Sequence, residues 1–432
     1  MSIDKTTKIK NYINDVCSYI KLKEAHHEIA SEISSHIEDI YEEGIKNGLS
    51  KEVALDEAIK RMGNPSEVGK QLNLAHKGSP DWITLILTLA LVNIGVILMY
   101  ILKSNNIAEN IDYIFNRSLL SASLGSLMIV LLYLFDYRKL EKYSKYIFVS
   151  TITLLILFTQ FVHFEDISQV TIVTTIASYI LIISLAGIFT NWNWNRKTNL
   201  LKGIFLLALP SAIMTFGNST ASAVIYTAGF IVLALKSRIK LKYIFSIGII
   251  SISAVSFTIL NRPYMLKRLT AFLSPQMYST GIGYINVQLK TILSSSSFLG
   301  KGIVDAKYTL PKLHTEFIFS YILSSFGWFS IIILVILITG FIIRMTRITK
   351  NIKDEYGKLL CSGLISILLV QFLLNILMNL NLVPLMGISL PFISYGGILC
   401  LFNMISVGLI LSAYRRRNIS SSKKYLEDNN IS

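Results

Sequence analysis

The stretch WITLILTLALVNIGVILMYIL, residues 82–102, is an unbroken apolar run. An α-helix rises about 1.5 Å per residue, so this run is long enough to cross the roughly 30 Å hydrocarbon core of a bilayer. Comparable runs recur to the end of the chain and predict about ten transmembrane helices. The predicted spans are 82–102, 118–135, 146–163, 169–190, 200–216, 220–236, 243–260, 315–343, 358–380 and 393–413.

The composition agrees with a chain that lies mostly in lipid. Hydrophobic residues make up 52% of the 432 residues and charged residues 16%, whereas soluble domains are typically about a quarter charged. The net charge of +15 is unevenly placed, because residues 1–78 hold 11 Lys+Arg and 13 Asp+Glu, and the remainder carries +17. Since the excess lies between apolar runs, it indicates membrane topology and not a nucleic-acid partner.

The loop charges predict the orientation. Alternate connections are basic, and the short connections 164–168, 217–219 and 381–392 contain no Lys or Arg. Basic loops stay in the cytoplasm, so both termini are expected to be cytoplasmic. The long connection 261–314 is then extracellular, and its basic residues are compatible with this because long loops cross regardless of charge.

The first 78 residues have the pattern of a small helical bundle. Ile29, Ile33, Ile37 and Ile40 recur at helical spacing, Ser50 is placed to cap the next helix, and Gly63 to end it. We therefore expect a cytoplasmic helical domain at 1–78, a transmembrane domain at 79–415 and a cytoplasmic tail at 416–432. Residues 24–77 resemble the helical prefix domain of many bacterial permeases, which implies a regulatory or docking role.

Two regions carry a more specific pattern. The first combines GIGYINVQLK (281–290), FLGKG (298–302) and LPKLHTEFIF (310–319), and the second is PLMGISLPFISYGG (384–397). Together they resemble the SEDS proteins, the RodA, FtsW and SpoVE group of shape, elongation, division and sporulation proteins. The resemblance implies a peptidoglycan glycosyltransferase of the bacterial cell membrane. It would polymerise lipid II, the undecaprenyl-diphosphate-linked precursor, alongside a class B penicillin-binding transpeptidase.

Glu316 is the candidate catalytic residue. By the resemblance it stands where the family has an essential aspartate. The chemistry agrees, since glycosyl transfer needs a base for the acceptor hydroxyl and positive charge for the departing diphosphate. An ionisable residue where the outer loop enters a membrane helix is a functional candidate by default. The structural alternative is an exposed carboxylate at the interface.

Further residues are candidates for substrate binding. Cations of the outer loop are candidates for the diphosphate, although each could equally extend to the interface without a ligand. The Gly- and Pro-rich stretch near 394–397 is expected to shape a cavity beside Glu316, or to be a structural re-entrant turn. A divalent cation, Mg²⁺ or Mn²⁺, could bridge Glu316 and the diphosphate; no organic cofactor and no metal site made of protein ligands alone is expected. The candidates are Arg262, Arg268, Gln288, Lys290, Lys301, His314, Ser394, Tyr395, Gly396 and Gly397.

Departures from the family pattern keep two alternatives open. Glu316 is one methylene longer than the family's aspartate, and the acidic pair usual further along is here Ser324-Ser325. The chain could therefore be a catalytically inactive scaffold or regulator. It could also be a flippase of the lipid-linked precursor, although no internal repeat of the transporter kind is visible.

Overall fold

The structure is a computed structural model. It describes residues 2–21, 23–75, 78, 80–107, 110–161, 167–245, 248–249, 256, 260, 263–302, 310–395 and 397–418. The chain divides into two compact units, which we describe separately. One comprises residues 1–80, 352–354 and 414–432, and the other residues 81–351 and 355–413.

The N-terminal unit is built from four α-helices with an apolar interior. These are α1 (Ser2–Ser18), α2 (His26–Lys46), α3 (Lys51–Met62) and α4 (Pro65–Ala75), with the short 3-10 turn η1 (Lys23–Ala25) before α2. Ile29, Ile33 and Ile37 are all buried on one face of α2 and pack with Val16 of α1. The predicted helical periodicity is thus confirmed.

The predicted helix boundaries of this unit are also present. The Ser50 hydroxyl accepts a hydrogen bond from Val53 N (3.5 Å), and Gly63 follows α3 with a φ of +87°. Tyr12 of α1 donates its hydroxyl to the Gly63 carbonyl (3.1 Å), which fastens this turn to the rest of the unit.

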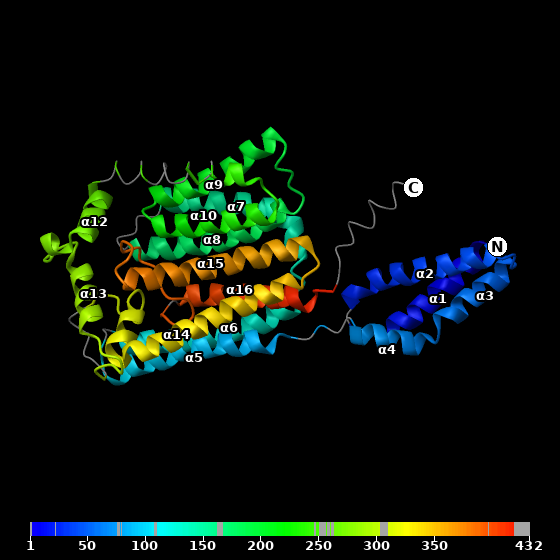
Figure 1. Ribbon diagram of the computed structural model, residues 1–432, viewed down its shortest axis with the longest axis horizontal. Helices are drawn as coiled ribbons and strands as arrows, with labels where there is room; N and C mark the ends of the chain where they lie inside the picture. Colours follow the sequence, from blue (N-terminus) through cyan, green and yellow to red (C-terminus); the bar gives the residue numbers. More distant parts are fainter. Residues whose placement is uncertain are drawn as a thin grey trace. The chain divides into compact units, whose positions relative to one another are not determined.

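The second unit is a bundle of long apolar helices (Figure 1). Within the described residues its long helices are α5 (Trp82–Ser104), α6 (Ile111–Leu134), α7 (Lys139–Phe161), α8 (Ile167–Phe189), α9 (Lys197–Phe216), α10 (Thr220–Lys236), α14 (Ile318–Lys350), α15 (Glu355–Asn379) and α16 (Ile398–Arg415). Seven of these are both long and apolar enough to cross a membrane, and α10 is a shorter apolar helix. All nine of these helices, α7 included, match predicted spans. Most of the tenth predicted span, 243–260, lies outside the described residues.

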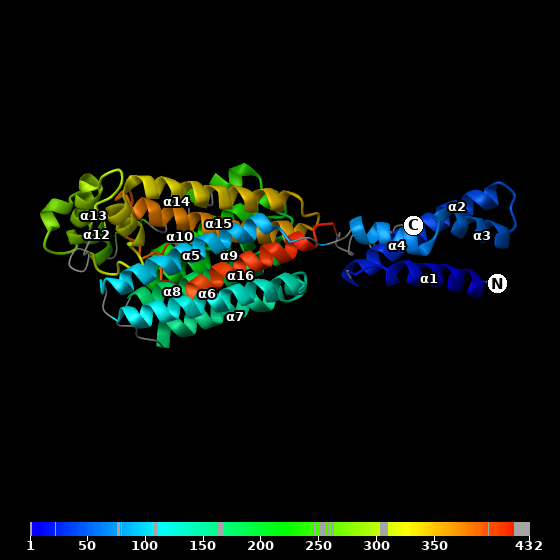
Figure 2. The ribbon, with the colours of Figure 1, turned by 90° about the horizontal axis from the view of Figure 1, so that it is seen from below.

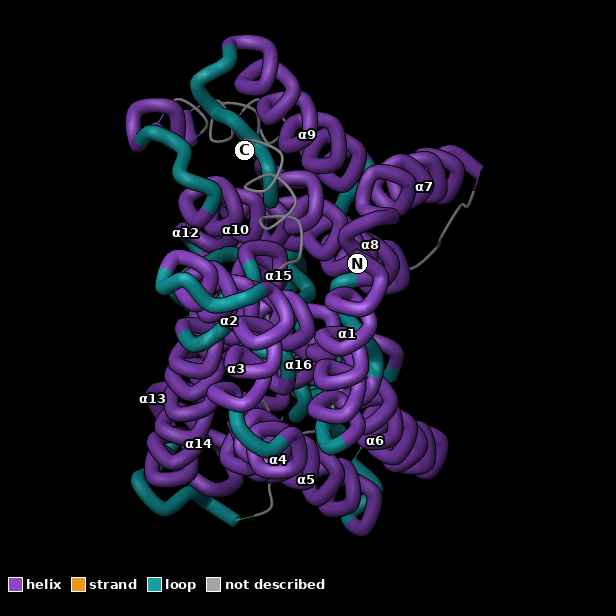
Figure 3. The backbone as a smooth tube through the Cα atoms, turned by 90° about the vertical axis from the view of Figure 1, so that its right-hand side faces the viewer, coloured by secondary structure: helices purple, strands orange, loops and turns teal. Residues whose placement is uncertain are grey.

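All described segments are helices or loops (Figure 3). The expectation of an all-α, multi-pass membrane protein is therefore confirmed. The middle of the bundle is formed by α8, α15 and α16, whose apolar windows are 61%, 67% and 61% buried, against 17% for α6. The site described below is built on these central helices.

Four helix boundaries differ from the predicted spans by five residues or more. Helices α6 and α7 begin at Ile111 and Lys139, both earlier than expected, and α14 continues through Arg344 and Arg347 to Lys350. Cations are favoured in the last turns of a helix and extend toward water, so the basic stretch continues the helix instead of ending it. Helix α16 starts only at Ile398, because the preceding residues form an irregular segment.

Two short helices lie across one end of the bundle, at a steep angle to the long helices (Figures 1 and 2). They are α12 (Pro263–Leu273) and α13 (Tyr284–Ser295), with the 3-10 turn η2 (Pro275–Tyr278) between them. Leu289 of α13 is fully buried, whereas the neighbouring Lys290 is exposed. Such a crosswise amphipathic arrangement is typical of helices that lie in the membrane interface.

Helix α14 is broken at Gly327, whose φ of +76° only glycine adopts readily. A Cβ at this position would overlap Phe298 O and Gly300 N. The segment around Gly300 hydrogen-bonds to the break, since Phe329 N donates to Phe298 O (3.0 Å) and Lys301 N donates to Ser324 O (3.2 Å). The break thus ties residues 297–302 to the first turns of α14.

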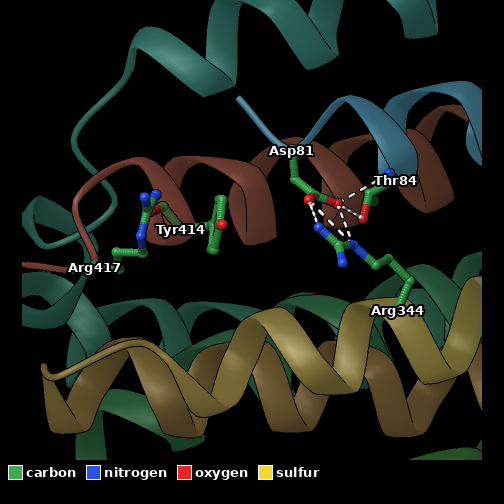
Figure 4. A network of polar contacts seen from close by, with 5 residues as sticks. All are labelled: Asp81, Thr84, Arg344, Tyr414 and Arg417. Carbon is green, nitrogen blue, oxygen red and sulfur yellow. Dashed lines mark hydrogen bonds and ion pairs between the residues drawn. The ribbon is translucent and has the colours of Figure 1, made fainter. Parts of the chain in front are cut away.

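An ion pair joins α5 to α14 (Figure 4). Asp81 caps α5 by accepting from Thr84 N (3.0 Å), and it also accepts from Arg344 Nε (3.0 Å). Burial alone would raise the pKa of the Asp81 carboxyl, but the hydrogen bonds from Arg344 and Thr84 outweigh it and lower this pKa. The pair therefore stabilises the folded state where Asp81 is ionised.

We predict that Asp81→Asn lowers the unfolding free energy by about 1.5–3 kcal/mol at neutral pH, the range for hydrogen bonds to charged groups. Because the folded-state pKa lies below the unfolded one, the difference should persist above the unfolded pKa. It should shrink as the pH falls through the folded pKa. The difference in unfolding free energy between the native protein and the variant is measured in detergent, at pH 7.5 and again in acid. Asp112→Asn, which removes an exposed pair with Lys103, is the control and should change little.

Candidate functional site

A cavity of about 380 Å³ opens at the end of the bundle where α8 begins and α15 ends. It lies between the segment that precedes α14, the segment that precedes α16, and the central helices. Its walls combine hydroxyl, amide and charged groups with a few apolar side chains. They are formed by Thr171, Ile172, Thr175, Lys312, His314, Thr315, Glu316, Gln371, Gly387, Ile388, Ser389, Tyr395, Gly397, Ile398 and Leu399.

Glu316 is the carboxylate of this cavity. Its side chain is 14% exposed, and its Oε1 lies 3.7 Å from Lys312 Nζ. Lys312 has a φ of +55°, a left-handed conformation unusual for a side chain of this size, and Glu316 N donates to Lys312 O (3.1 Å). The turn therefore places an ammonium group beside the carboxylate, at the mouth of a hollow that is only partly open to water.

Two buried amides of α15 hold the backbone of this turn. Asn375 Nδ2 and Asn379 Nδ2 each donate to the Glu316 carbonyl at 3.0 Å. Asn375 also donates to Ile388 O (2.7 Å), on the other side of the cavity. Both asparagines are fully buried. Non-helical backbone inside a membrane bundle needs internal partners, and these two side chains supply them to both walls.

His314 lies on the same wall. Its ring packs against Tyr395 with centroids 5.8 Å apart, and Tyr395 N donates to His314 O (2.8 Å). Helix α14 begins only at Ile318, so His314 and Glu316 lie in the turns before it and both line the cavity. Burial, and then the charge of Lys312, lower the pKa of the His314 imidazole, so it is neutral at physiological pH.

The structure distributes the predicted site residues over three places. Glu316, His314, Tyr395 and Gly397 line the cavity together. Ser394 does not line it; the buried hydroxyl accepts from Leu390 N (2.8 Å) and so shapes the irregular segment. Arg262 and Gly396 lie outside the described residues.

The other loop candidates lie outside the cavity wall. Arg268 of α12 donates through Nη2 to the Leu385 carbonyl, which holds the segment leading to Gly387. Gln288 is half-buried on α13, and Lys290 and Lys301 are exposed.

Several wall residues were not predicted. Lys312 could have been found from its position four residues before Glu316, the spacing of neighbours on one helical turn. Gln371, Asn375 and Asn379 also recur every four residues in an otherwise apolar span, a pattern that indicates a polar face toward the bundle interior. Gln371 is 4% exposed, and its Nε2 has no hydrogen-bond partner among the described residues. This amide is a donor available to a ligand.

The metal expectation can be compared with the wall chemistry. Within the described part of the chain, no group of three or more His, Cys, Asp or Glu residues is placed to hold an ion. Glu316 is the one carboxylate among the described wall residues, and it already has Lys312 as a neighbour. These residues alone do not form a metal site, so a cation would need oxygen ligands from the substrate.

With this geometry established, we compared the chain with known proteins. Residues 81–419 match the cell cycle protein family of FtsW, RodA and SpoVE. The chain belongs to this family. The match covers the whole bundle and both motif regions, so the resemblance found in the sequence is confirmed.

The matches to curated relatives cover nearly the full length of those relatives. A probable peptidoglycan glycosyltransferase FtsW of Trichlorobacter lovleyi is 25% identical over 356 residues, covering 77% of this chain and 92% of its own. Stage V sporulation protein E of Bacillus subtilis is also 25% identical, covering 78% of this chain and 98% of its own. This chain therefore contains nearly all of each relative and has additional residues of its own.

Solved structures share the fold. A chain from a peptidoglycan synthase complex superposes with a TM-score of 0.66 at 19% identity, covering 78% of this chain and 98% of its own. RodA of Thermus thermophilus gives 0.57 at 17% identity, covering 79% and 98%. At these identities the likeness establishes the architecture of the family and not the chemistry.

We predict that Lys312→Gln raises the pKa of His314 toward its ordinary value, because one of the two causes of the depression is removed while burial remains. NMR titration of protein with isotope-labelled histidine, assigned by His314→Asn, measures this shift. An unchanged His314 pKa would mean that the ammonium group does not reach the imidazole in solution.

Proposed function

We propose that this protein is a peptidoglycan glycosyltransferase that polymerises lipid II at the outer face of the bacterial cell membrane. The observation that carries the proposal is the pairing of Glu316 with Lys312 in a half-enclosed cavity that also holds His314 and Tyr395. Family membership and the names of the relatives support it. The distribution of basic loops supports the outer location, because it favours cytoplasmic termini.

The proposed reaction joins an acceptor sugar hydroxyl to the anomeric carbon of the lipid-linked donor. The new glycosidic C–O bond forms as the bond from that carbon to the diphosphate oxygen breaks. The carboxylate of Glu316 takes the proton of the acceptor hydroxyl, and undecaprenyl diphosphate leaves.

Lys312 has two roles in this proposal. Its ammonium group lies beside the Glu316 carboxylate and orients it, and it attracts the diphosphate of the donor. His314 is neutral and can donate one hydrogen bond while accepting another. A divalent cation between the diphosphate and Glu316 would add positive charge to the same place, but the steps assigned to Glu316 and Lys312 do not depend on it.

The partner expected in the membrane is a class B penicillin-binding transpeptidase, which would cross-link the new strand. This part of the proposal draws support from the peptidoglycan synthase complex, whose chain shares the fold. The helical unit at the N-terminus is proposed to act in regulation or docking in the cytoplasm.

The test of the proposal is polymerisation of fluorescent lipid II by the purified protein, alone and with a candidate transpeptidase. We expect glycan ladders whose formation falls by about 10²–10⁴-fold in Glu316→Gln, the usual contribution of a general base. Glu316→Asp keeps the charge and should retain part of the activity. Asp112→Asn, an exposed carboxylate outside the cavity wall, is the matched control and should be fully active.

Other outcomes would favour the alternatives. Tight binding of lipid II without ladders in either preparation would contradict catalysis and favour a scaffold. Movement of precursor across liposome membranes without polymer would favour a flippase.

Gln371 gives a second test. Its Nε2 lines the cavity and has no hydrogen-bond partner within 3.5 Å among the described residues, so we expect it to donate to an oxygen of the bound glycan. Gln371→Met should leave thermal stability unchanged or higher, and it should weaken lipid II binding by roughly twofold to tenfold, the range of one hydrogen bond. Unchanged lipid II affinity would show that this amide only fills space.

A further inference from the structure

A second cavity, of about 430 Å³, lies at the opposite end of the bundle, where α8 and α10 end and α15 begins. Helix α8 has 23 residues, so about 34 Å of helix separates this end from the Glu316 site. Three cations and three aromatic rings contribute to its wall: Lys236, Arg238, Lys358, Phe189, Trp192 and Trp194. Nothing in the proposed transferase reaction uses this cavity.

The charge of this wall is strongly positive. Three asparagines of 191–195 are neutral, and Glu355 is the one carboxylate among the described wall residues. None of the three cations forms an ion pair within the part of the chain that the structure describes. An exposed lysine is commonly surrounded by water, without another cation nearby. Here three cations from two separate chain segments line the same cavity. That arrangement attracts an anion.

Arg238 is held in a conformation that costs stability. It follows the last turn of α10 with a φ of +66°, and Ile239 N donates to Ala234 O (3.2 Å) in the helix-ending pattern that normally uses glycine. A left-handed side-chain residue costs roughly 1–2 kcal/mol relative to glycine. Most other non-glycine residues with positive φ are asparagines, which tolerate it. Glycine would end this helix at a lower conformational cost, so the presence of arginine here is not explained by the helix end. Arg238 lines the cavity, which gives its side chain a role in binding.

The aromatic wall gives the cavity a rigid side. Phe189 packs edge-on against Trp194, with centroids 5.1 Å apart, and Trp192 lies 5.5 Å from Phe189. The Trp194 indole donates to Ser237 Oγ (2.8 Å), next to Arg238. The Trp192 Nε1 is buried without a hydrogen-bond partner among the described residues, so a donor remains for a ligand. Tryptophan is enriched at the ends of membrane helices, where the lipid headgroups lie.

We propose that this cavity binds the phosphate group of an anionic phospholipid from the inner leaflet of the membrane. Arg238 offers the planar fork that suits phosphate oxygens, and Lys236 and Lys358 add charge from either side. Basic pockets between transmembrane helices on the cytoplasmic side are suited to such headgroups. The phosphate chemistry is shared with a soluble phosphate ester, and the experiment distinguishes the two sources. The inference is independent of the transferase proposal, because it involves neither Glu316 nor lipid II.

The test uses the full-length protein in a neutral detergent. Dioctanoyl phosphatidylglycerol and, as the control lipid, dioctanoyl phosphatidylcholine are titrated while tryptophan fluorescence and the melting temperature are followed. We expect saturable binding of the anionic lipid and little response to the zwitterionic one. Lys236→Gln and Lys358→Gln should each weaken binding by about fivefold, the effect of roughly 1 kcal/mol per cation. Lys202→Gln, an exposed lysine outside the wall, should bind normally.

Arg238→Gly separates ligand binding from folding. Without lipid, the variant should melt at the same temperature as the native protein or higher, because glycine suits the left-handed position. Its affinity for phosphatidylglycerol should nevertheless fall by at least fivefold, because one phosphate-binding cation is lost. Binding that inorganic phosphate does not displace assigns the site to the lipid, and displacement at millimolar phosphate assigns it to a soluble ester.

Three results would overturn the proposal. They are equal responses to the two lipids, unchanged affinity in Arg238→Gly, or an equal loss in Lys202→Gln, which would indicate diffuse surface charge instead of a site.

Discussion

Two side-chain amides inside the bundle, those of Asn375 and Asn379, hold the segments on which the rest of the site depends. The polypeptide before α14 and before α16 is not helical, and within a membrane its carbonyl groups cannot rely on water. By donating to Glu316 O and Ile388 O, the amides set the distance between the two walls of the outer cavity. The carboxylate, the imidazole and the Tyr395 ring occupy defined positions because the backbone beneath them is fixed to a central helix.

This region is low in acidic groups. Ser324 and Ser325 stand where the SEDS resemblance predicts an acidic pair, and their main-chain carbonyls accept hydrogen bonds from Lys301 N and Gly302 N. Glu316 therefore stands alone among the described carboxylates of the wall, with one ammonium neighbour.

The fold could be predicted largely from the sequence, because a chain buried in lipid must form long apolar helices. Any break in such a helix leaves backbone hydrogen-bonding groups unsatisfied. The helix that begins at Trp82 and the isoleucine face of α2 are examples where one physical requirement decides the structure. The site was predicted less completely. Glu316 and His314 were identified from their motif, but Lys312 was not among the candidates, although it stands four residues before Glu316. The left-handed turn that places its side chain beside the carboxylate is not visible in the sequence. Arg268 was predicted to bind substrate, and in the structure its side chain donates a hydrogen bond to the Leu385 carbonyl.

The interruption of α14 at Gly327 has a mechanical consequence. Main-chain hydrogen bonds join the strip of residues 297–302 to the part of α14 that precedes and follows the break. This part of the helix starts two residues after Glu316, so the strip and the helix start are expected to move together. A displacement of residues 297–302 would therefore also displace the turn that carries Glu316, so the position of the carboxylate depends on how this strip is held.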